Sequence, residues 1–218
     1  LELSSMHYAL KHQAPATVLY DFSAAFPSLS QGFLIRTLEN LGLPQPAVQL
    51  VKALYYEHKG VSSLAGSRGD SFHLTAGIRQ GCPLSPLLFV MAVDGLLRRV
   101  ANESPNTFAR MYSDDTAMVL QDFQVDLPLL DGIFKDLQKA AQLHLNIAKC
   151  VFIPLFEGNP DEVRDRIGAV TPTFQQVAIQ DHGKYLGFYV GPGKDDRSWE
   201  AALEKAEKQV RAWEWATL

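Results

Sequence analysis

The chain of 218 residues is 47% hydrophobic, so it can bury the core of one domain or of two small ones. It contains no run of eighteen apolar residues and does not open on a basic segment followed by an apolar one, so we expect an intracellular protein without a membrane span or secretory signal. The net charge of −4 speaks against a simple nucleic-acid binder, which holds phosphates with clustered Lys and Arg, although carboxylates that bind metals would lower the charge of a catalytic core.

The first half of the chain predicts one buried strand, two helices and a hairpin. Residues Ala16–Phe22 (ATVLYDF) form a short apolar run, which is typical of a buried strand that delivers Asp21 at its C-terminal end. Apolar residues at helical spacing predict helices over residues 30–41 and 46–54. Small, polar and apolar residues alternate over residues 60–76 around a glycine-rich turn, which predicts a hairpin with a loop of several residues.

The second half predicts another hairpin between two long helices. Residues 83–100 and 127–145 place apolar side chains at three- and four-residue steps, the pattern of amphipathic helices. Between them, Phe108–Tyr112 and Thr116–Leu120 are predicted as short strands that flank two adjacent acids at the hairpin tip. Further elements are expected as strands over residues 150–153, 177–179 and 185–190, and as helices over residues 161–167 and 198–215.

The order of these elements lacks the regular alternation of strand and helix that marks a doubly wound fold. It predicts an α+β domain in which helices back a largely antiparallel sheet. Cys82 and Cys150 stand alone, without a CxxC pair or a nearby histidine pair. Buried reduced thiols are therefore expected, rather than a zinc site or a disulfide.

Three carboxylates would converge at one edge of this sheet if the strand before Asp21 lies beside the hairpin of Asp114 and Asp115. Clustered acids repel one another unless a cation neutralises them, and Mg²⁺ prefers carboxylate and phosphate oxygens. Two such ions, roughly 3.5 to 4 Å apart, can stabilise the attacking and leaving oxygens of a phosphoryl displacement. The three acids therefore predict nucleotidyl transfer or phosphodiester hydrolysis, although an acid pair in a turn is, taken alone, more often just a solvated turn.

Five segments, in order between residues 17 and 190, resemble the motifs of one enzyme family. Asp21-Phe22-Ser23-Ala24-Ala25-Phe26 is similar to the first carboxylate motif of reverse transcriptases, and Tyr112-Ser113-Asp114-Asp115 resembles their aromatic-x-Asp-Asp motif. Gly77 to Phe89 (GIRQGCPLSPLLF) is similar to the nucleotide-binding motif of the non-LTR retrotransposon (LINE-like) and group II intron branch. Leu145 to Cys150 (LNIAKC) and Tyr185-Leu186-Gly187 resemble the two later motifs. The chain thus resembles the reverse transcriptase domain of this branch.

The resemblance implies a metal site built from the first and third of these segments. Asp21 and Asp114 would be the main ligands of two Mg²⁺ ions, with Mn²⁺ as an alternative. Asp115 would lie beside them, and the backbone carbonyl of Phe22 would supply a further oxygen.

The resemblance also implies residues that contact the substrates. Phe26 would stack beneath the incoming sugar and exclude a 2′-hydroxyl, whereas the competing interpretation is a core phenylalanine. Gln80, with Gly81 letting the backbone approach closely, would contact the nucleotide and the template base, and Tyr112 would contact substrate at the hairpin tip. Lys149 would neutralise or protonate the leaving pyrophosphate, unless it is a solvated surface lysine.

For the whole chain, the resemblance implies a polymerase palm over residues 1–193 and a linker with the start of a helical thumb over residues 194–218, with the fingers largely missing. The expected function is RNA-directed DNA polymerase, with an RNA template, a DNA primer and dNTPs as partners, in a piece of a retrotransposon polyprotein. The resemblance further implies residence in the nucleus and association with other domains of the polyprotein. It implies no membrane partner. Two alternatives stay open: an inactive remnant or nucleic-acid-binding module, and an RNA-dependent RNA polymerase, which normally avoids a bulky residue at the position of Phe26.

Overall fold

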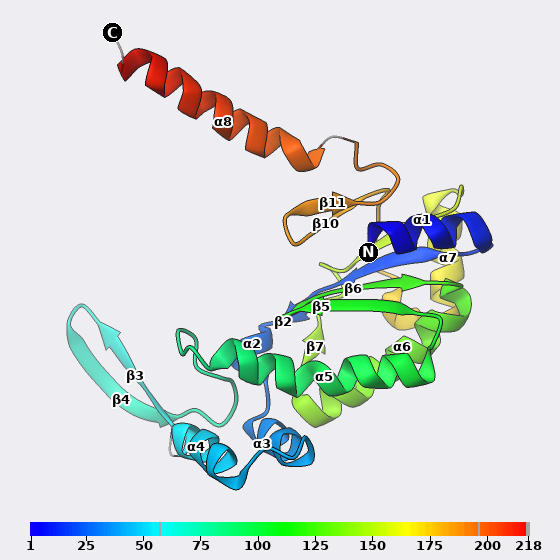
Figure 1. Ribbon diagram of the computed structural model, residues 1–218. Helices are drawn as coiled ribbons and strands as arrows, with labels where there is room; N and C mark the ends of the chain where they lie inside the picture. Colours follow the sequence, from blue (N-terminus) through cyan, green and yellow to red (C-terminus); the bar gives the residue numbers. More distant parts are fainter. Residues whose placement is uncertain (57, 196, 217–218) are drawn as a thin grey trace.

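A five-stranded sheet forms the centre of the protein in the computed structural model, which describes residues 1–56, 58–195 and 197–216 (Figure 1). Its strands are β1 (Ala16–Tyr20), β5 (Phe108–Tyr112), β6 (Asp115–Leu120), β8 (Val151–Pro154) and β9 (Ala178–Ile179). Their order is β5-β6-β1-β8-β9, and all five residues of the inner strand β1 are buried. Because both faces of β1 are covered, its sequence is a continuous apolar run rather than an alternating one.

The pairing of the strands makes this sheet mixed rather than wholly antiparallel. β1 pairs antiparallel with β6, where Tyr20 faces Thr116, and with β8, where Leu19 faces Val151. β8 and β9 run parallel, and helix α7 (Pro160–Val170) connects them, since a parallel pair needs such a crossover. The predicted antiparallel sheet is therefore confirmed for four strands and wrong for the fifth.

Helices pack on one face of the sheet and form the larger core. Val18 and Met118 lie in this core with residues of α3 (Gln31–Asn40), α5 (Ser85–Glu103) and α6 (Phe123–Ala141). All three helices were predicted from apolar residues at helical spacing. Their buried stripes pack against each other and against the sheet, which fixes the strands that carry the site.

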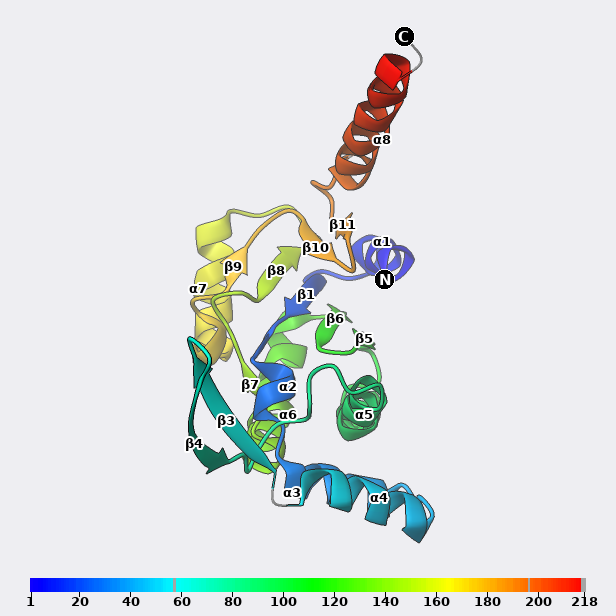
Figure 2. The ribbon, with the colours of Figure 1, turned by 90° about the vertical axis from the view of Figure 1, so that its left-hand side faces the viewer.

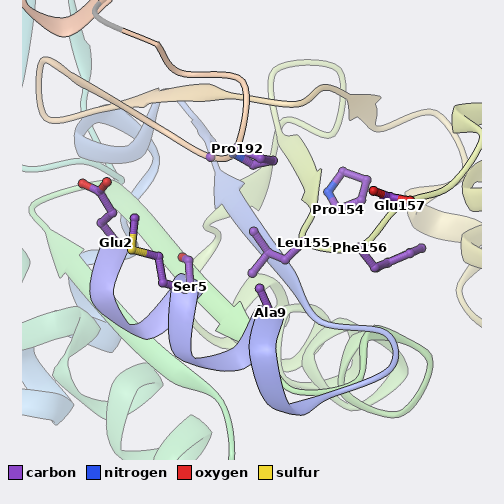
Figure 3. A pocket seen from close by; sticks show the side chains of 10 residues that line it. Glu2, Ser5, Ala9, Pro154, Leu155, Phe156, Glu157 and Pro192 are labelled. Atoms are coloured by element: carbon purple, nitrogen blue, oxygen red, sulfur yellow. The ribbon is translucent and has the colours of Figure 1, made fainter.

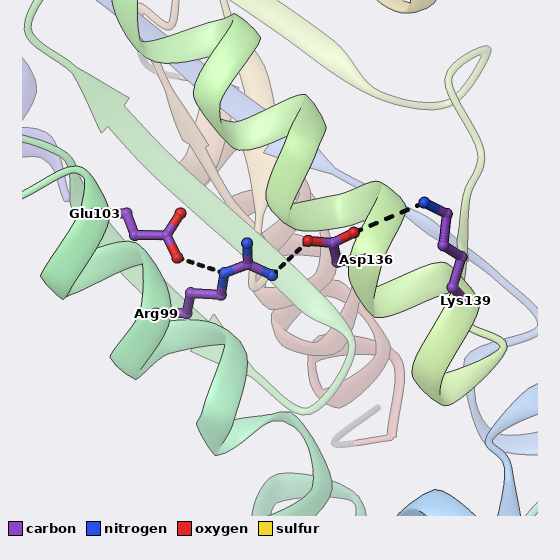
Figure 4. Close-up of polar contacts among 4 residues, drawn as sticks. All are labelled: Arg99, Glu103, Asp136 and Lys139. Atoms are coloured by element: carbon purple, nitrogen blue, oxygen red, sulfur yellow. Dashed lines mark hydrogen bonds and ion pairs between the residues drawn. The ribbon is translucent and has the colours of Figure 1, made fainter.

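An exposed ion-pair network joins α5 to α6 (Figure 4). Arg99 on α5 donates to Glu103 at 2.6 Å on the same helix and to Asp136 at 2.9 Å on α6, and Lys139 lies 3.8 Å from Asp136. Only the Arg99–Asp136 pair crosses between the helices, and its side chains are about half exposed, so it stabilises their contact by at most about 1 kcal/mol. The apolar core, and not this network, holds the two helices together.

A smaller cluster covers the opposite face, where Leu19, Ala117 and Ile153 pack with Val190. The helix α1 (Glu2–Lys11), which the sequence did not predict, lies over β1 and β6 on this side. A groove of about 380 Å³ runs between α1 and the chain from the end of β8 onward (Figure 3). None of the residues predicted as the site lines it.

Two predicted elements differ from the observed ones. Helix α6 ends at Ala141 rather than at residue 145, because Gln142 adopts a left-handed conformation with φ of 60°. The two residues of β7 (His144–Leu145) instead pair with β2 (Phe22–Ser23). The single strand predicted over residues 185–190 is a hairpin, β10 (Gly183–Tyr185) and β11 (Phe188–Val190).

The remaining elements surround this core. The predicted hairpin, β3 (Lys59–Leu64) and β4 (Ser67–His73), extends away from the body, as does α8 (Arg197–Ala216) at the other end (Figures 1 and 2). No helix within the described ranges is long and apolar enough to cross a membrane. The other elements are α2 (Ala25–Ser28), α4 (Gln45–Tyr55) and the short 3₁₀ helix η1 (Pro172–Phe174).

Candidate active site

The three predicted acids converge at one edge of the sheet. Asp21 follows the last residue of β1, and Asp114 lies in the two-residue turn between β5 and β6. Because Tyr20 pairs with Thr116, the end of β1 lies beside the start of β6 at Asp115. Burial raises the pKa of Asp115, and the negative charges of Asp114 and Asp21 raise it further. The predicted convergence of the carboxylates is thus present in the structure.

Asp21 and Asp114 line a cavity of about 510 Å³, whereas Asp115 is exposed beside it. None of the three forms an ion pair with a Lys, Arg or His that the structure describes. The oxygen donors and the uncompensated negative charge fit a hard divalent cation. No group of three or more His, Cys, Asp or Glu among the described residues is already gathered as a ligand set, so the fit is one of charge and donor type.

The turn that carries Asp114 has an unusual backbone. Ser113 has a φ of 56°, in the left-handed region that a two-residue hairpin turn requires and that glycine adopts more readily. The hydroxyl of Thr116 donates to the backbone carbonyl of Asp114 at 3.3 Å. Tyr112, just before the turn, is 69% exposed and does not line the cavity of the acids.

The backbone of Asp21 is held by the segment that follows β7. The backbone carbonyl of Asp21 accepts a hydrogen bond from the Asn146 backbone nitrogen at 2.8 Å, and its nitrogen donates to the Cys150 sulfur at 3.4 Å. Cys150 is fully buried, and burial raises the pKa of its thiol to about 11, so the thiol stays neutral beside the acid. The expectation of a buried reduced cysteine is confirmed for Cys150, while Cys82 is partly exposed.

The same segment brings Lys149 to the cavity wall, together with Asn146. The pairing of Phe22 with Leu145 places the segment next to Asp21. Lys149 is exposed and forms no ion pair with a described carboxylate, so its ammonium is available to a ligand. Asn146 was not predicted as a site residue, and its place within the LNIAKC motif is the signal that could have identified it.

Phe26 combines the two interpretations that the sequence left open. Its ring stacks on Phe89 of α5 with a centroid distance of 4.6 Å and an interplanar angle of 15°. It also lines the cavity of the acids, as does Phe22. The core therefore holds one side of Phe26 in place while another part of the residue borders the cavity.

Gln80 reaches the cavity because the preceding loop runs close to α2. The Ile78 nitrogen donates to the Phe26 carbonyl at 2.9 Å, and the Gly77 nitrogen donates to the Leu29 carbonyl at 2.8 Å. A Cβ at Gly77 would lie 2.5 Å from the carbonyl oxygen of Pro27, so this close approach requires glycine. Gly81 has a φ of 82° and lines an adjoining cavity rather than that of the acids.

Residues 3–190 match the family described as reverse transcriptase (RNA-dependent DNA polymerase). The retrovirus-related Pol polyprotein from type-2 retrotransposable element R2DM of Drosophila melanogaster is 32% identical over 150 residues, which cover 65% of this chain and 14% of the relative. The transposon TX1 149 kDa protein of Xenopus laevis is 26% identical over 180 residues, which cover 78% of this chain and 13% of the relative. The chain thus spans only a small part of the length of these relatives.

Solved telomerases share the fold. Apo telomerase from Candida tropicalis aligns with a TM-score of 0.61 at 13% identity, covering 91% of this chain and 36% of the telomerase chain. Telomerase from Candida albicans in complex with a fragment of telomeric RNA aligns with a TM-score of 0.57 at 13% identity, covering 87% and 32%. Because the family match spans most of its length and the related Pol proteins agree with it, the chain belongs to the reverse transcriptase family and is a relative of the R2 and TX1 retrotransposon proteins.

Proposed function

We propose that the chain is the palm of an RNA-directed DNA polymerase, which adds dNTPs to a DNA primer on an RNA template by two-metal nucleotidyl transfer. The observation that carries the proposal is the single cavity lined by Asp21, Asp114, Lys149, Gln80 and Phe26. Separate segments of the chain supply these groups, and each has a use in phosphoryl transfer. A structural role would not require acids, a cation and an amide around one open space.

The acids would hold two Mg²⁺ ions, or Mn²⁺ ions, through the carboxylates of Asp21 and Asp114 and the backbone carbonyl of Phe22. When bound, such ions neutralise charge on the attacking and leaving oxygens of the displacement. Asp115, whose pKa is raised by burial and by its acidic neighbours, contributes negative charge beside them rather than on the cavity wall. Its carboxylate increases the attraction of the site for cations.

The other residues of the cavity would bind and orient the substrates. Lys149 holds a proton on an ammonium that can neutralise or protonate the leaving pyrophosphate. Phe26, fixed by its stacking on Phe89, would lie beneath the sugar and leave no room for a 2′-hydroxyl. Gln80 would contact the nucleotide and the template base, while Gly81 and the exposed Tyr112 would contact substrate from the adjoining surfaces.

In the longer polypeptide, residues 1–193 would form the palm, and residues 194–218 would form a linker and the start of a helical thumb. Helix α8 lies within residues 194–218 and extends from the body, as the first helix of a thumb would (Figure 2). The fingers, the full thumb and further nucleic-acid-binding domains would be supplied by other parts of a retrotransposon polyprotein. The nucleus is the compartment in which this function would be carried out.

Primer extension tests the proposal, with the chain produced together with its native flanking sequence. The substrates are an RNA template, a DNA primer and dNTPs, with Mg²⁺ or Mn²⁺, and the control is the Asp114→Asn, Asp115→Asn double variant. We expect extension by the parent and none by the control. Lack of extension by a folded parent that binds the primer–template would instead identify an inactive remnant.

A further inference from the structure

A second cavity of about 580 Å³ adjoins the cavity of the acids. Pro27 and Gln80 lie on the walls of both. Among the residues that the structure describes, the walls of the second cavity carry three basic side chains and no carboxylate: His58 and Lys59 at the base of the β3–β4 hairpin, and Arg79 in the loop before Gln80. We call these three residues the basic cradle.

The positive charges of the basic cradle are not compensated within the described part of the chain. Neither Lys59 nor Arg79 forms an ion pair with any carboxylate that the structure describes. The Nδ1 atom of His58 is shielded from solvent and has no hydrogen-bond partner among the described residues. Burial lowers the pKa of His58, and the charge of Arg79 lowers it further, so these groups lie close enough to repel. An anion bound between them would relieve that repulsion.

Hydrogen bonds to backbone carbonyls fix both sides of the basic cradle. The Leu74 nitrogen donates to the His58 carbonyl at 2.7 Å, which closes the base of the hairpin. The amide of Gln31 donates to the Gly77 carbonyl at 3.0 Å, and the hydroxyl of the buried Ser85 donates to the Arg79 carbonyl. The cationic residues are thus held on a fixed backbone, so little ordering is needed when a ligand binds.

We propose that the basic cradle binds the phosphodiester backbone of the single-stranded template, next to the base that is being copied. The inference rests on the proposed function, in which the acids and Lys149 take the phosphates of the incoming nucleotide and Gln80 contacts the base pair. The sugar–phosphate backbones of two paired strands lie on opposite sides of each base pair. Phosphates that reach the adjoining cavity, past Gln80, therefore belong to the template strand.

The local charge agrees with this assignment. Residues 57–80 contain three fixed cations, Lys59, Arg68 and Arg79, against the two carboxylates of Glu57 and Asp70, so the segment has a net charge of +1. The whole chain has a net charge of −4, and the remaining residues therefore sum to −5. Positive charge is concentrated where the template would enter.

The test is binding of a labelled primer–template in Ca²⁺, which avoids turnover, with template overhangs of zero, one, two and four nucleotides beyond the primer end. We expect the parent to bind tighter as the overhang grows, and Lys59→Gln and Arg79→Gln each to remove roughly tenfold of that gain. Each substitution should also reduce the salt slope of log K by about 0.7, the value for one single-strand phosphate contact. Arg68→Gln, on the same hairpin but not on the cavity wall, is the matched control and should keep the gain.

Three results would overturn the basic cradle. The first is a gain in affinity with overhang length that survives in Lys59→Gln and Arg79→Gln. The second is an equal loss of that gain in Arg68→Gln. The third is a raised KM for dNTP in Lys59→Gln and Arg79→Gln with the overhang gain intact, which would assign the bound phosphates to the nucleotide. Primer extension in Mg²⁺ separates this inference from the proposed function. If the parent extends primers but its affinity does not rise with the overhang, only template binding by the basic cradle is refuted. If its affinity rises with the overhang but it does not extend primers, only the proposed polymerase function is refuted.

Discussion

Gly77 is the position where the backbone around the candidate site has least room for a side chain. It has a φ of 83°, and a Cβ there would lie 2.5 Å from the oxygen and 2.9 Å from the carbonyl carbon of Pro27, backbone atoms that cannot rotate away. A left-handed conformation costs an L-residue roughly 1–2 kcal/mol. Separating the segments would also break the bonds from Gly77 to Leu29 and from Ile78 to Phe26, each worth about 1 kcal/mol. We expect Gly77→Ala to lower the free energy of unfolding by roughly 3–4 kcal/mol.

Gly42→Ala is the matched control, because Gly42 has a φ of 73° and a Cβ added there would meet no atom within 4 Å. The Gly42→Ala variant has the conformational cost of a left-handed residue but no steric clash, so we expect its free energy of unfolding to fall by about 1–2 kcal/mol. Urea denaturation followed by far-ultraviolet circular dichroism gives both values. In primer extension, Gly77→Ala should lose far more activity than Gly42→Ala, because the shifted loop carries Gln80. Equal losses of stability in the two variants would refute the close approach of this loop to Pro27.

Three further predictions concern the acids, the buried thiol and the sugar pocket. The folded-state pKa of Asp115 is raised, so its repulsion with Asp114 and Asp21 is present above that pKa and is relieved as the pH falls through it. Asp115→Asn should therefore raise the free energy of unfolding at pH 7, by at most about 0.5 kcal/mol because solvent screens the exposed carboxylate. In denaturation series at different pH values, this gain should vanish below about pH 3.8. Iodoacetamide should alkylate Cys82 but not Cys150 in the folded protein at pH 8, as mass spectrometry would report, because Cys150 is fully buried with a pKa of about 11. In primer extension, Phe26→Val should raise the ratio of ribonucleotide to deoxynucleotide incorporation at least about tenfold, or ~1.4 kcal/mol. An unchanged ratio would show that Phe26 only packs against Phe89 and does not select the sugar.

The sequence predicted the elements that bury a regular apolar stripe and failed where burial leaves no such pattern. Helix α1 was missed because Leu3 and Leu10 are 83% and 87% exposed, and Ser5 is its only buried residue among those described, so no apolar face marks it. β9 has two residues, too few to reveal the parallel pairing. The end of α6 was misplaced because Gln142 occupies the left-handed position where glycine is the usual signal.

The grouping of the candidate site residues was easier to predict than the surrounding structure, because these residues lie in short ordered motifs. Those motifs led to the acids, Phe26, Gln80 and Lys149, which the fold brings to one edge. They could not reveal the hydrogen bonds from Asn146 and to Cys150 that hold Asp21, because such contacts depend on the pairing of β2 with β7. They also gave no sign of the basic cradle, whose members come from two segments that only the fold joins.

The separation of charge around Gln80 removes the difficulty that an acidic chain poses for the proposed polymerase function. A copying site needs negative charge where metal ions and a triphosphate meet, and positive charge where a phosphate backbone enters. In this chain the acids gather at the tip of the β5–β6 hairpin and the end of β1, and cations without an ion-pair partner among the described residues gather at the base of the β3–β4 hairpin and in the loop before Gln80. Gln80 and Pro27 border both spaces. The net charge of −4 is a sum over the whole chain, and it conceals the opposite local charges that a nucleic-acid strand would meet in these two regions.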